Sequence, residues 1–192
     1  MNVLIVAATE LEIVSPQIKE KSILISGIGM VNTSIKLTKE LIKKKYDLVI
    51  NMGVAGSFLN ELKNGDVVEV IEDFFSEIGF ENGDSFSIFS DFNLKTKYQV
   101  DAKTALRKVR GITVNTVHGN NQTISEIIER LNPEVESMEG AAVFQVCEEF
   151  NIPCLQIRSV SNKVEKRNRN SWDIDLAIEN LNTEVEKILN SL

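Results

Sequence analysis

Apolar runs of strand length alternate along this chain with segments of helical periodicity, and this alternation limits the choice of fold more than any other feature. The runs expected to form buried strands are residues 2–8, 22–26, 47–52, 67–71, 111–117 and 154–160, with a further short strand at Val135. Such an alternation is typical of α/β proteins, in which helices cover both faces of a largely parallel sheet. The sequence has no internal repeat or linker, so we expect a single domain over residues 1–192.

Four segments carry apolar residues at the spacing of an amphipathic helix. The expected buried faces are Val31, Ile35, Thr38 and Ile42; Ile124, Ile127, Ile128 and Leu131; Val143, Val146, Cys147 and Phe150; and Ile174, Ala177, Ile178, Leu181, Val185, Ile188 and Leu192. Thr123 and Glu126 have the spacing of a capping box, which predicts the start of the second of these helices. The stretch from Asp73 to Tyr98 is the least regular, and we expect a hairpin and loops there.

Composition argues against several classes of partner. The net charge of −7 argues against nucleic acid, whose binding surfaces are basic. One histidine, His118, and two separated cysteines, Cys147 and Cys154, predict no metal site and two buried apolar thiols. Gly27 and Gly29 lack the third glycine of a dinucleotide fingerprint, so we expect no cofactor. No segment resembles a signal peptide or reaches the ~20 apolar residues of a membrane span, which predicts a cytoplasmic protein without a membrane partner.

Chemically unusual residues follow four of the expected strands. They are Glu10 and Glu12 after the first strand, the glycines of residues 53–56, the acidic segment 136–142, and the basic segment 158–172. Taken singly, each has an ordinary structural explanation: surface acids, a tight turn, an acid at a helix N-terminus and a solvated charge run. Because ligands of α/β proteins usually bind at the carboxyl ends of strands, the four segments together are the candidate site.

These four segments resemble the nucleoside phosphorylase and nucleosidase superfamily. The matching motifs are Ala-Thr-x-x-Glu at 8–12, Asn-x-Gly-x-Ala-Gly at 51–56, Ser-Met-Glu-Gly-Ala-Ala at 137–142 and Ile-Arg-Ser-Val-Ser-Asn at 157–162. The resemblance covers nearly the whole chain and is poorest from residue 74 to residue 108. It implies a three-layer α/β/α sandwich around a mixed, partly closed sheet, and an N-glycosyl hydrolase of nucleosides that works as a homo-oligomer, a dimer or higher.

Within this superfamily, residues 111–119, 135–143 and 161–172 are most similar to the futalosine hydrolases. The last stretch carries most weight, because its Ser-Asn-x-Val-Glu-x-Arg-Asn-Arg-x-x-Trp pattern is long and unusual. The resemblance implies futalosine as substrate, a hypoxanthine nucleoside with a carboxyphenyl-ketone tail. Its cleavage would release hypoxanthine and dehypoxanthine futalosine in menaquinone biosynthesis. The alternatives are a methylthioadenosine/adenosylhomocysteine nucleosidase, a purine nucleoside phosphorylase and a non-catalytic nucleoside-binding protein.

The resemblance also implies roles for individual residues. Glu12 matches the base that activates water, and Glu139 matches the carboxylate that grips the ribose hydroxyls. Asn162 stands where the nucleosidases of adenine compounds carry an aspartate, so we count it with Glu12 as catalytic. Further substrate contacts are expected from Val54, Ala55, Gly56, Met138, Arg158 and Ser161.

An amide at position 162 favours inosine-like over adenosine-like substrates. Asparagine cannot act as an acid, but its donor suits O6 of a 6-oxopurine and its acceptor suits a protonated N7. The simpler explanation, that Asn162 is only a turn residue, stays open.

The distribution of arginines bears on the nucleophile and on the tail of the substrate. The first arginine is Arg107, so no guanidinium in the first hundred residues can clamp a phosphate, and we expect water as the nucleophile. Arg167 or Arg169 could bind the tail carboxylate, with Trp172 stacked on the aryl ring. Alternatively, these arginines pair with Glu165 or with a neighbouring subunit.

Overall fold

The computed structural model describes residues 1–83, 85–89 and 91–192. Its strands are β1 (Val3–Ala7), β2 (Ser22–Ile25), β3 (Leu48–Ser57), β4 (Val67–Phe75), β5 (Phe80–Asn82), β6 (Ser85–Ser87), β7 (Lys97–Gln99), β8 (Arg107–Thr113), β9 (Val135–Ser137) and β10 (Cys154–Lys163). Its helices are α1 (Pro16–Lys19), α2 (Met30–Lys43), α3 (Asn121–Leu131), α4 (Gly140–Glu149) and α5 (Ile174–Ser191), with 3₁₀ turns η1 (Glu10–Glu12) and η2 (Arg169–Ser171).

Within the described residues, an eight-stranded mixed sheet forms the centre of the molecule and closes on itself at one end. Strand β10 pairs in parallel with β3 and antiparallel with β4. Strand β4 also pairs with β8, β8 pairs with β9, and β9 pairs with β3, which closes this part of the sheet. From β3 the sheet continues through β1 to β2 in parallel pairing. Strand β3 pairs with β1 along its first half and with β9 at its end, so it belongs to both parts of the sheet. The mixed, partly closed sheet is as expected.

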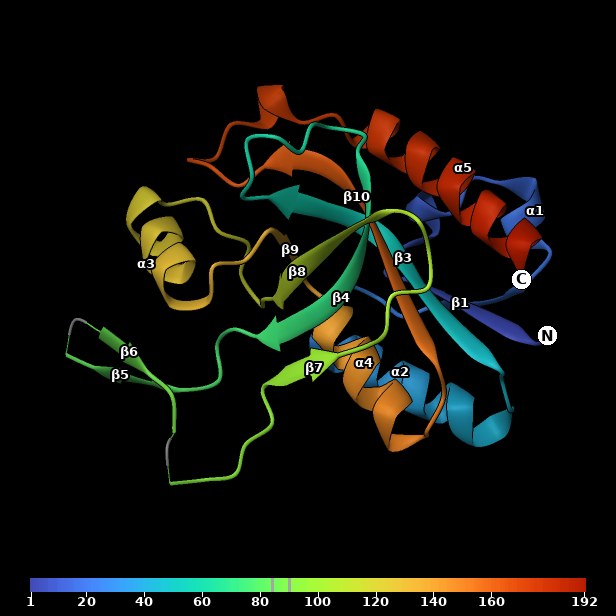
Figure 1. The fold of residues 1–192 in the computed structure, drawn as a ribbon, viewed down its shortest axis with the longest axis horizontal. Helices are drawn as coiled ribbons and strands as arrows, with labels where there is room; N and C mark the ends of the chain where they lie inside the picture. Colours follow the sequence, from blue (N-terminus) through green and yellow to red (C-terminus); the bar gives the residue numbers. More distant parts are fainter. Residues whose placement is uncertain (84, 90) are drawn as a thin grey trace.

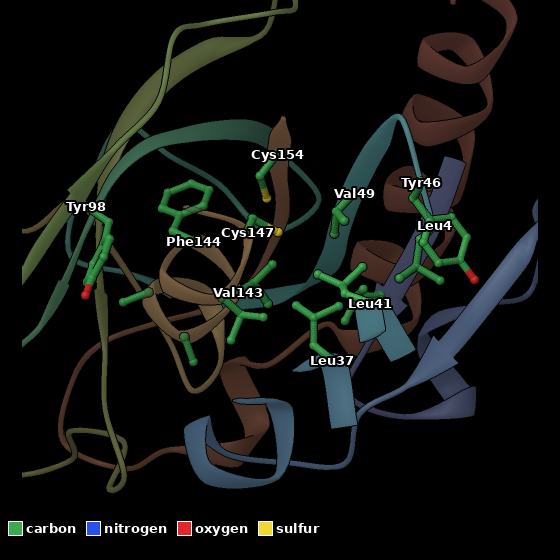
Figure 2. Packing of buried hydrophobic residues seen from close by; sticks show 14 of the residues in the cluster. Leu4, Leu37, Leu41, Tyr46, Val49, Tyr98, Val143, Phe144, Cys147 and Cys154 are labelled. Atoms are coloured by element: carbon green, nitrogen blue, oxygen red, sulfur yellow. The ribbon is translucent and has the colours of Figure 1, made fainter. Parts of the chain in front are cut away.

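Helices cover the two faces of this sheet and give the predicted three layers (Figure 1). Helices α2 and α4 lie together on one face, and α5 with α1 lies on the other (Figure 1). On the first face Leu37 and Leu41 of α2 and Val143 and Phe144 of α4 belong to one apolar cluster, which also contains both cysteines (Figure 2). Both cysteines are free and buried, which confirms the expectation for the thiols. In the described part of the chain, no helix combines the length and the apolar character needed to cross a membrane.

The buried face predicted for α2 is wrong. Val31, Ile35 and Ile42 are 65%, 50% and 70% exposed, whereas the side chains that enter the core are Thr33, Leu37 and Leu41. Both stripes have helical spacing, so periodicity alone cannot tell which of them faces the sheet. The buried hydroxyl of Thr33 has a partner, because it donates a hydrogen bond to Ser26 Oγ (3.1 Å).

The predicted start of the second amphipathic helix is also wrong. Helix α3 begins at Asn121, and the side chain of Asn120 accepts a hydrogen bond from the backbone N–H of Gln122 (2.8 Å). Thr123 instead lies in the first turn and donates its hydroxyl to the Asn120 carbonyl (3.1 Å). Asparagine caps helices as well as threonine does, and it stands three residues earlier.

Four strands differ from their predicted ranges by more than one residue. Strands β3 and β10 pair with each other and continue to Ser57 and Lys163. Strand β8 begins at Arg107 and ends at Thr113, and it pairs with β4 over this range. Strand β4 continues to Phe75 beside β8. The hairpin expected in the irregular stretch is present as β5 and β6.

Candidate active site

The carboxyl end of β1, the second half of β3, and β9 and β10 border a cavity of about 300 Å³. This volume lies at the lower end of the range of small-molecule sites. Of the residues predicted to form the site, the cavity is lined by Glu12, Val54, Ala55, Gly56, Met138, Glu139, Ser161, Asn162, Arg167 and Trp172. The structure therefore brings the four strand-end segments together, while Arg158 and Arg169 lie outside the lining.

Glu12 ends the short 3₁₀ turn η1, which follows β1 directly. Its side chain is buried, and Oε2 accepts a hydrogen bond from the backbone N–H of Thr9 (3.0 Å) while Oε1 accepts one from that of Val54 (3.3 Å). Burial raises the pKa of Glu12, and these hydrogen bonds and the charge of Arg158 oppose the rise without cancelling it. A fixed carboxylate with raised proton affinity is suited to accept a proton from water.

The charge of Arg158 acts on this carboxylate from outside the lining of the cavity. Its side chain is 1% exposed, and Nη2 donates hydrogen bonds to Asn51 Oδ1 and Gln156 Oε1. A Cβ atom at Gly53 would lie 2.2 Å from Arg158 Nη1 and 2.8 Å from Glu12 Oε1, so only glycine leaves room for both groups. The predicted contact of Arg158 with the substrate is therefore wrong. Its guanidinium is enclosed by protein, because this side chain of β10 points toward Gln156 and Asn51 and not into the cavity.

Glu139 stands at the strand-to-helix junction that the sequence predicted, as the residue before α4. Its side chain is 6% exposed, and Oε1 accepts a hydrogen bond from the backbone N–H of Gly29 (2.9 Å). Gly29 has φ of +92°, a conformation that glycine adopts readily. Met138 precedes Glu139 and also lines the cavity, so a carboxylate and an apolar side chain face the same space.

Asn162 lines the cavity near the end of β10, where β10 pairs with β3 at Gly56. Its Oδ1 accepts a hydrogen bond from Ser161 Oγ (2.9 Å), and its Nδ2 donates to the Lys163 carbonyl (3.0 Å). Gly56 has no side chain here, and a Cβ atom would lie 3.2 Å from Asn162 Nδ2. The amide is thus held at the cavity wall by its neighbours in the chain.

The basic segment after β10 folds over the cavity. The guanidinium of Arg167 lies 5.1 Å from the centre of the Trp172 ring, and that of Arg169 lies 5.9 Å from it. The backbone N–H of Arg167 donates to the Gly119 carbonyl (3.4 Å), which ties this segment to the loop after β8. Arg169 begins η2, and its side chain does not reach the lining, so the expected substrate contact there has no support in the geometry.

The lining also contains residues to which the sequence analysis gave no role in the site, and two of them, His118 and Glu136, form a pair. The Nδ1 atom of His118 lies 2.7 Å from Glu136 Oε2, and the backbone N–H of His118 donates to Glu136 Oε1 (3.1 Å). In the sequence analysis, His118 was weighed only as a possible metal ligand. Their positions in the sequence could have indicated a role in the site. His118 follows the strand β8, and Glu136 lies in β9, three residues before Glu139.

Known proteins resemble this chain in sequence and in fold. The model of the phosphorylase superfamily matches residues 7–192. The chain is 31% identical over 191 residues to the 5'-methylthioadenosine/S-adenosylhomocysteine nucleosidase of Marinomonas sp. (strain MWYL1), across 89% of this chain and 81% of the relative. It is also 31% identical over 183 residues to the enzyme of the same name from Psychromonas ingrahamii, across 87% and 79%.

Solved structures share the fold at lower identity. The Neisseria meningitidis 5'-methylthioadenosine/S-adenosylhomocysteine nucleosidase in complex with methylthio-immucillin-A has a TM-score of 0.83 and 22% identity, with 99% of both chains covered. Futalosine hydrolase of Helicobacter pylori has a TM-score of 0.84 and 17% identity, across 99% of this chain and 97% of that one. Together with the family match and the two carboxylates in one cavity, these likenesses lead to one conclusion. The chain belongs to the phosphorylase superfamily and is an N-glycosyl hydrolase of the nucleosidase type.

Proposed function

We propose that this nucleosidase hydrolyses a purine nucleoside, with water activated by Glu12 and the ribose held by Glu139. The observation that carries the proposal is the presence of two buried carboxylates, from the turn after β1 and the start of α4, in the lining of one cavity. A single acid at a strand end has many explanations. Two that converge on a nucleoside-sized space match the two tasks that N-glycoside hydrolysis requires.

Cleavage of an N-ribosidic bond passes through a state in which positive charge develops on the sugar. A base must take a proton from the attacking water, and the raised pKa of Glu12 suits that task. Hydrogen bonds from the ribose hydroxyls to Glu139 strengthen as the sugar becomes positive, because the acceptor is anionic. Arg158 acts on the reaction through Glu12 and not by touching the substrate.

We propose that the substrate is futalosine and that the purine released from it is hypoxanthine. Asn162 supports a 6-oxopurine, because its amide can donate to O6 but cannot protonate N7. Arg167 and Trp172 both line the cavity, which supports binding of an aryl tail and its carboxylate on that side. The lysine and arginine side chains of the described lining, Lys163 and Arg167, lie at the end of β10 and in the segment after it, which supports water over phosphate as the nucleophile.

A second candidate is cleavage of methylthioadenosine or adenosylhomocysteine. The observation in its favour is that the relatives at 31% identity carry the name of that enzyme. The two candidates share the ribose chemistry and differ in the group that faces the base, so position 162 decides between them.

The test is the product profile of the protein and of Asn162→Asp on futalosine, aminofutalosine and methylthioadenosine, with and without phosphate. We expect the unmodified protein to release hypoxanthine from futalosine without phosphate. Asn162→Asp should raise the ratio of kcat/KM for methylthioadenosine over futalosine by about tenfold or more, the effect of ~1.4 kcal/mol, because aspartic acid can protonate N7 and accept from the 6-amino group.

Asn190→Asp is the matched control, since Asn190 is exposed at the end of α5 and the substitution adds the same charge. It should leave the substrate ratio unchanged. Preferred cleavage of methylthioadenosine by the unmodified protein would favour the second candidate, and phosphate-dependent cleavage would contradict hydrolysis.

A further inference from the structure

We propose that His118, oriented by Glu136, gives the departing purine the proton that Asn162 cannot supply. This inference rests on the proposed function and adds a further catalytic residue to it. It starts from a pair of side chains in the cavity wall that the two-carboxylate mechanism leaves without a task.

Glu136 holds the imidazole of His118 in one orientation. Glu136 is 4% exposed, and its Oε2 lies 2.7 Å from His118 Nδ1 while its Oε1 accepts the backbone N–H of His118 (3.1 Å). The imidazole is 14% exposed, and the edge of the Phe58 ring packs against it with the ring centres 6.3 Å apart. A carboxylate on Nδ1 fixes the proton there, so the second ring nitrogen, Nε2, is the one available for exchange. Within the described residues Nε2 has no hydrogen-bond partner.

The sheet places this pair beside the residue that faces the base. Gly56 of β3 is paired with Glu136 of β9 on one side and with Asn162 of β10 on the other. A Cβ atom at Gly56 would lie 3.5 Å from Glu136 Cγ and 3.2 Å from Asn162 Nδ2, so both side chains fill the space that this glycine leaves open. The imidazole–carboxylate pair and the amide therefore line the same end of the cavity.

A purine leaves an N-glycoside most easily when it is protonated. Asn162 can donate a hydrogen bond but holds no transferable proton at neutral pH. Imidazole exchanges protons in that range, which makes it the usual general acid in enzymes. His118 thus has the chemistry that the amide lacks, and it lies at the end of the cavity where the amide lies.

The proposed step balances as follows. Water oxygen bonds to C1′ while Glu12 takes one of the water protons. The C1′–N9 bond breaks, and its electron pair goes to the base. The imidazolium of His118 transfers the Nε2 proton to N7, and the neutral ring keeps its Nδ1 proton in the hydrogen bond to Glu136. Glu12 then releases its proton to solvent and His118 takes one up, which restores the starting state.

The competing explanation is purely structural, because Glu136 also anchors the loop backbone and His118 also borders a second, more open hollow of about 770 Å³ beside α3. A leaving group that needs no proton separates the two roles. We would measure kcat for His118→Gln on a hypoxanthine nucleoside and on 4-nitrophenyl β-D-ribofuranoside, whose phenolate departs unprotonated.

We expect His118→Gln to lose about 10²–10³-fold on the purine substrate and less than about threefold on the nitrophenyl riboside. Glu136→Gln should show the same selectivity with a smaller loss, because the imidazolium keeps an acceptor but loses its anionic partner. Gln122→Ala, which lines only the second hollow, is the control and should change neither rate.

Equal losses on both substrates would overturn the proposal, since they would indicate a structural role, and so would an unchanged purine rate in His118→Gln. Glu12→Gln must lose activity on both substrates, because water activation serves both. If Glu12→Gln keeps both activities, or the unmodified protein cleaves neither substrate, the proposed function fails independently of His118.

Discussion

Glu12 illustrates how a single residue can carry both a stability cost and an activity. Its carboxylate is removed from water and receives hydrogen bonds from Thr9 and Val54 in exchange. Desolvation exceeds these contributions, so the pKa of Glu12 is raised above its ordinary value of 4.5. Removal from water raises the proton affinity of the Glu12 carboxylate, which makes it a better base, and it also makes the charged form unfavourable in the folded chain.

The pH dependence of stability follows from this shift. The folded chain binds the Glu12 proton more tightly than the unfolded chain does, so the contribution to stability is complete below pH 4.5 and is lost as the pH rises through the folded-state pKa. Replacement of Glu12 by glutamine removes this loss. Measured by urea unfolding from pH 4 to pH 8, the free energy of unfolding of Glu12→Gln relative to the unmodified protein should therefore increase with pH.

The same variant should lose about 10²–10⁴-fold in kcat, the usual contribution of a general base. Glu10→Gln is the matched control, because Glu10 lies in the same turn with an exposed side chain, and it should keep its activity. A stability difference for Glu12→Gln that does not change with pH would contradict the assigned burial of charge.

At the scale of elements, helix α5 secures the turn that carries Glu12. Asn182 is 4% exposed on the buried face of α5, and its Oδ1 accepts the backbone N–H groups of Val14 (3.0 Å) and Ser15 (3.1 Å). Its Nδ2 donates to the carbonyls of Glu12 (3.0 Å) and Ile178 (2.8 Å). One amide thus satisfies four backbone groups and connects the last helix to the turn of Glu12, the proposed base.

Asn182→Ala should lower the free energy of unfolding by about 2–4 kcal/mol, because it leaves buried backbone groups without partners. It should also lower kcat, since the turn of Glu12 loses its tether. Urea unfolding and steady-state rates measure the two effects. Thr183→Ala, at the exposed neighbouring position, should stay within about 0.5 kcal/mol. Equal stability of the two variants would refute the tether.

Prediction of the buried helix face succeeded for the centre of α5, where one face is apolar, and failed for α2, where two faces are. The centre of α5 is buried through Leu181 and Val185, as its periodicity predicts. Helix α2 carries a second apolar stripe, and the sheet covers the one that contains Leu37. The choice depends on which stripe fits α4 and the strands below, and local spacing does not contain that information.

At the scale of the whole molecule, a buried polar network joins the closed part of the sheet to α4. Asp73 of β4 accepts hydrogen bonds from Gln156 Nε2 (2.8 Å) and from Thr113 Oγ1 (2.9 Å), and Thr113 Oγ1 in turn accepts the backbone N–H of Ala141 (2.7 Å). Burial raises the pKa of Asp73 to about 6. Because Gln156 also contacts Arg158, this network extends to the support of Glu12.

Helix α4 can begin close to this network because its first residue, Gly140, has no side chain. A Cβ atom there would lie 1.9 Å from Gln156 Oε1 and 2.2 Å from Asp73 Oδ2. Gly140→Ala should therefore lower the free energy of unfolding by about 1–3 kcal/mol or more and reduce activity by displacing Glu139. In Gly119→Ala the added methyl group meets its nearest atom at 3.6 Å, so chemical denaturation should show little change. Comparable losses in both variants would contradict the close packing.

The homo-oligomer implied by the superfamily stays a prediction at this scale. Sedimentation equilibrium would test it, because an assembly has at least twice the mass of one 21.5 kDa chain. A single-chain mass at working concentrations would exclude it.

The sequence alone determined the α/β class and the region of the site, because each depends on residues close together in the chain: strand-length apolar runs, helical spacing, and acids or glycines just after strands. Tertiary structure decided the rest. It closes β10 onto both β3 and β4, and it buries Arg158 close to Glu12, which lies about 150 residues earlier in the chain. It also brings His118 and Glu136 together with Asn162 beside Gly56. Such pairings depend on how all layers pack at once, which no local pattern encodes.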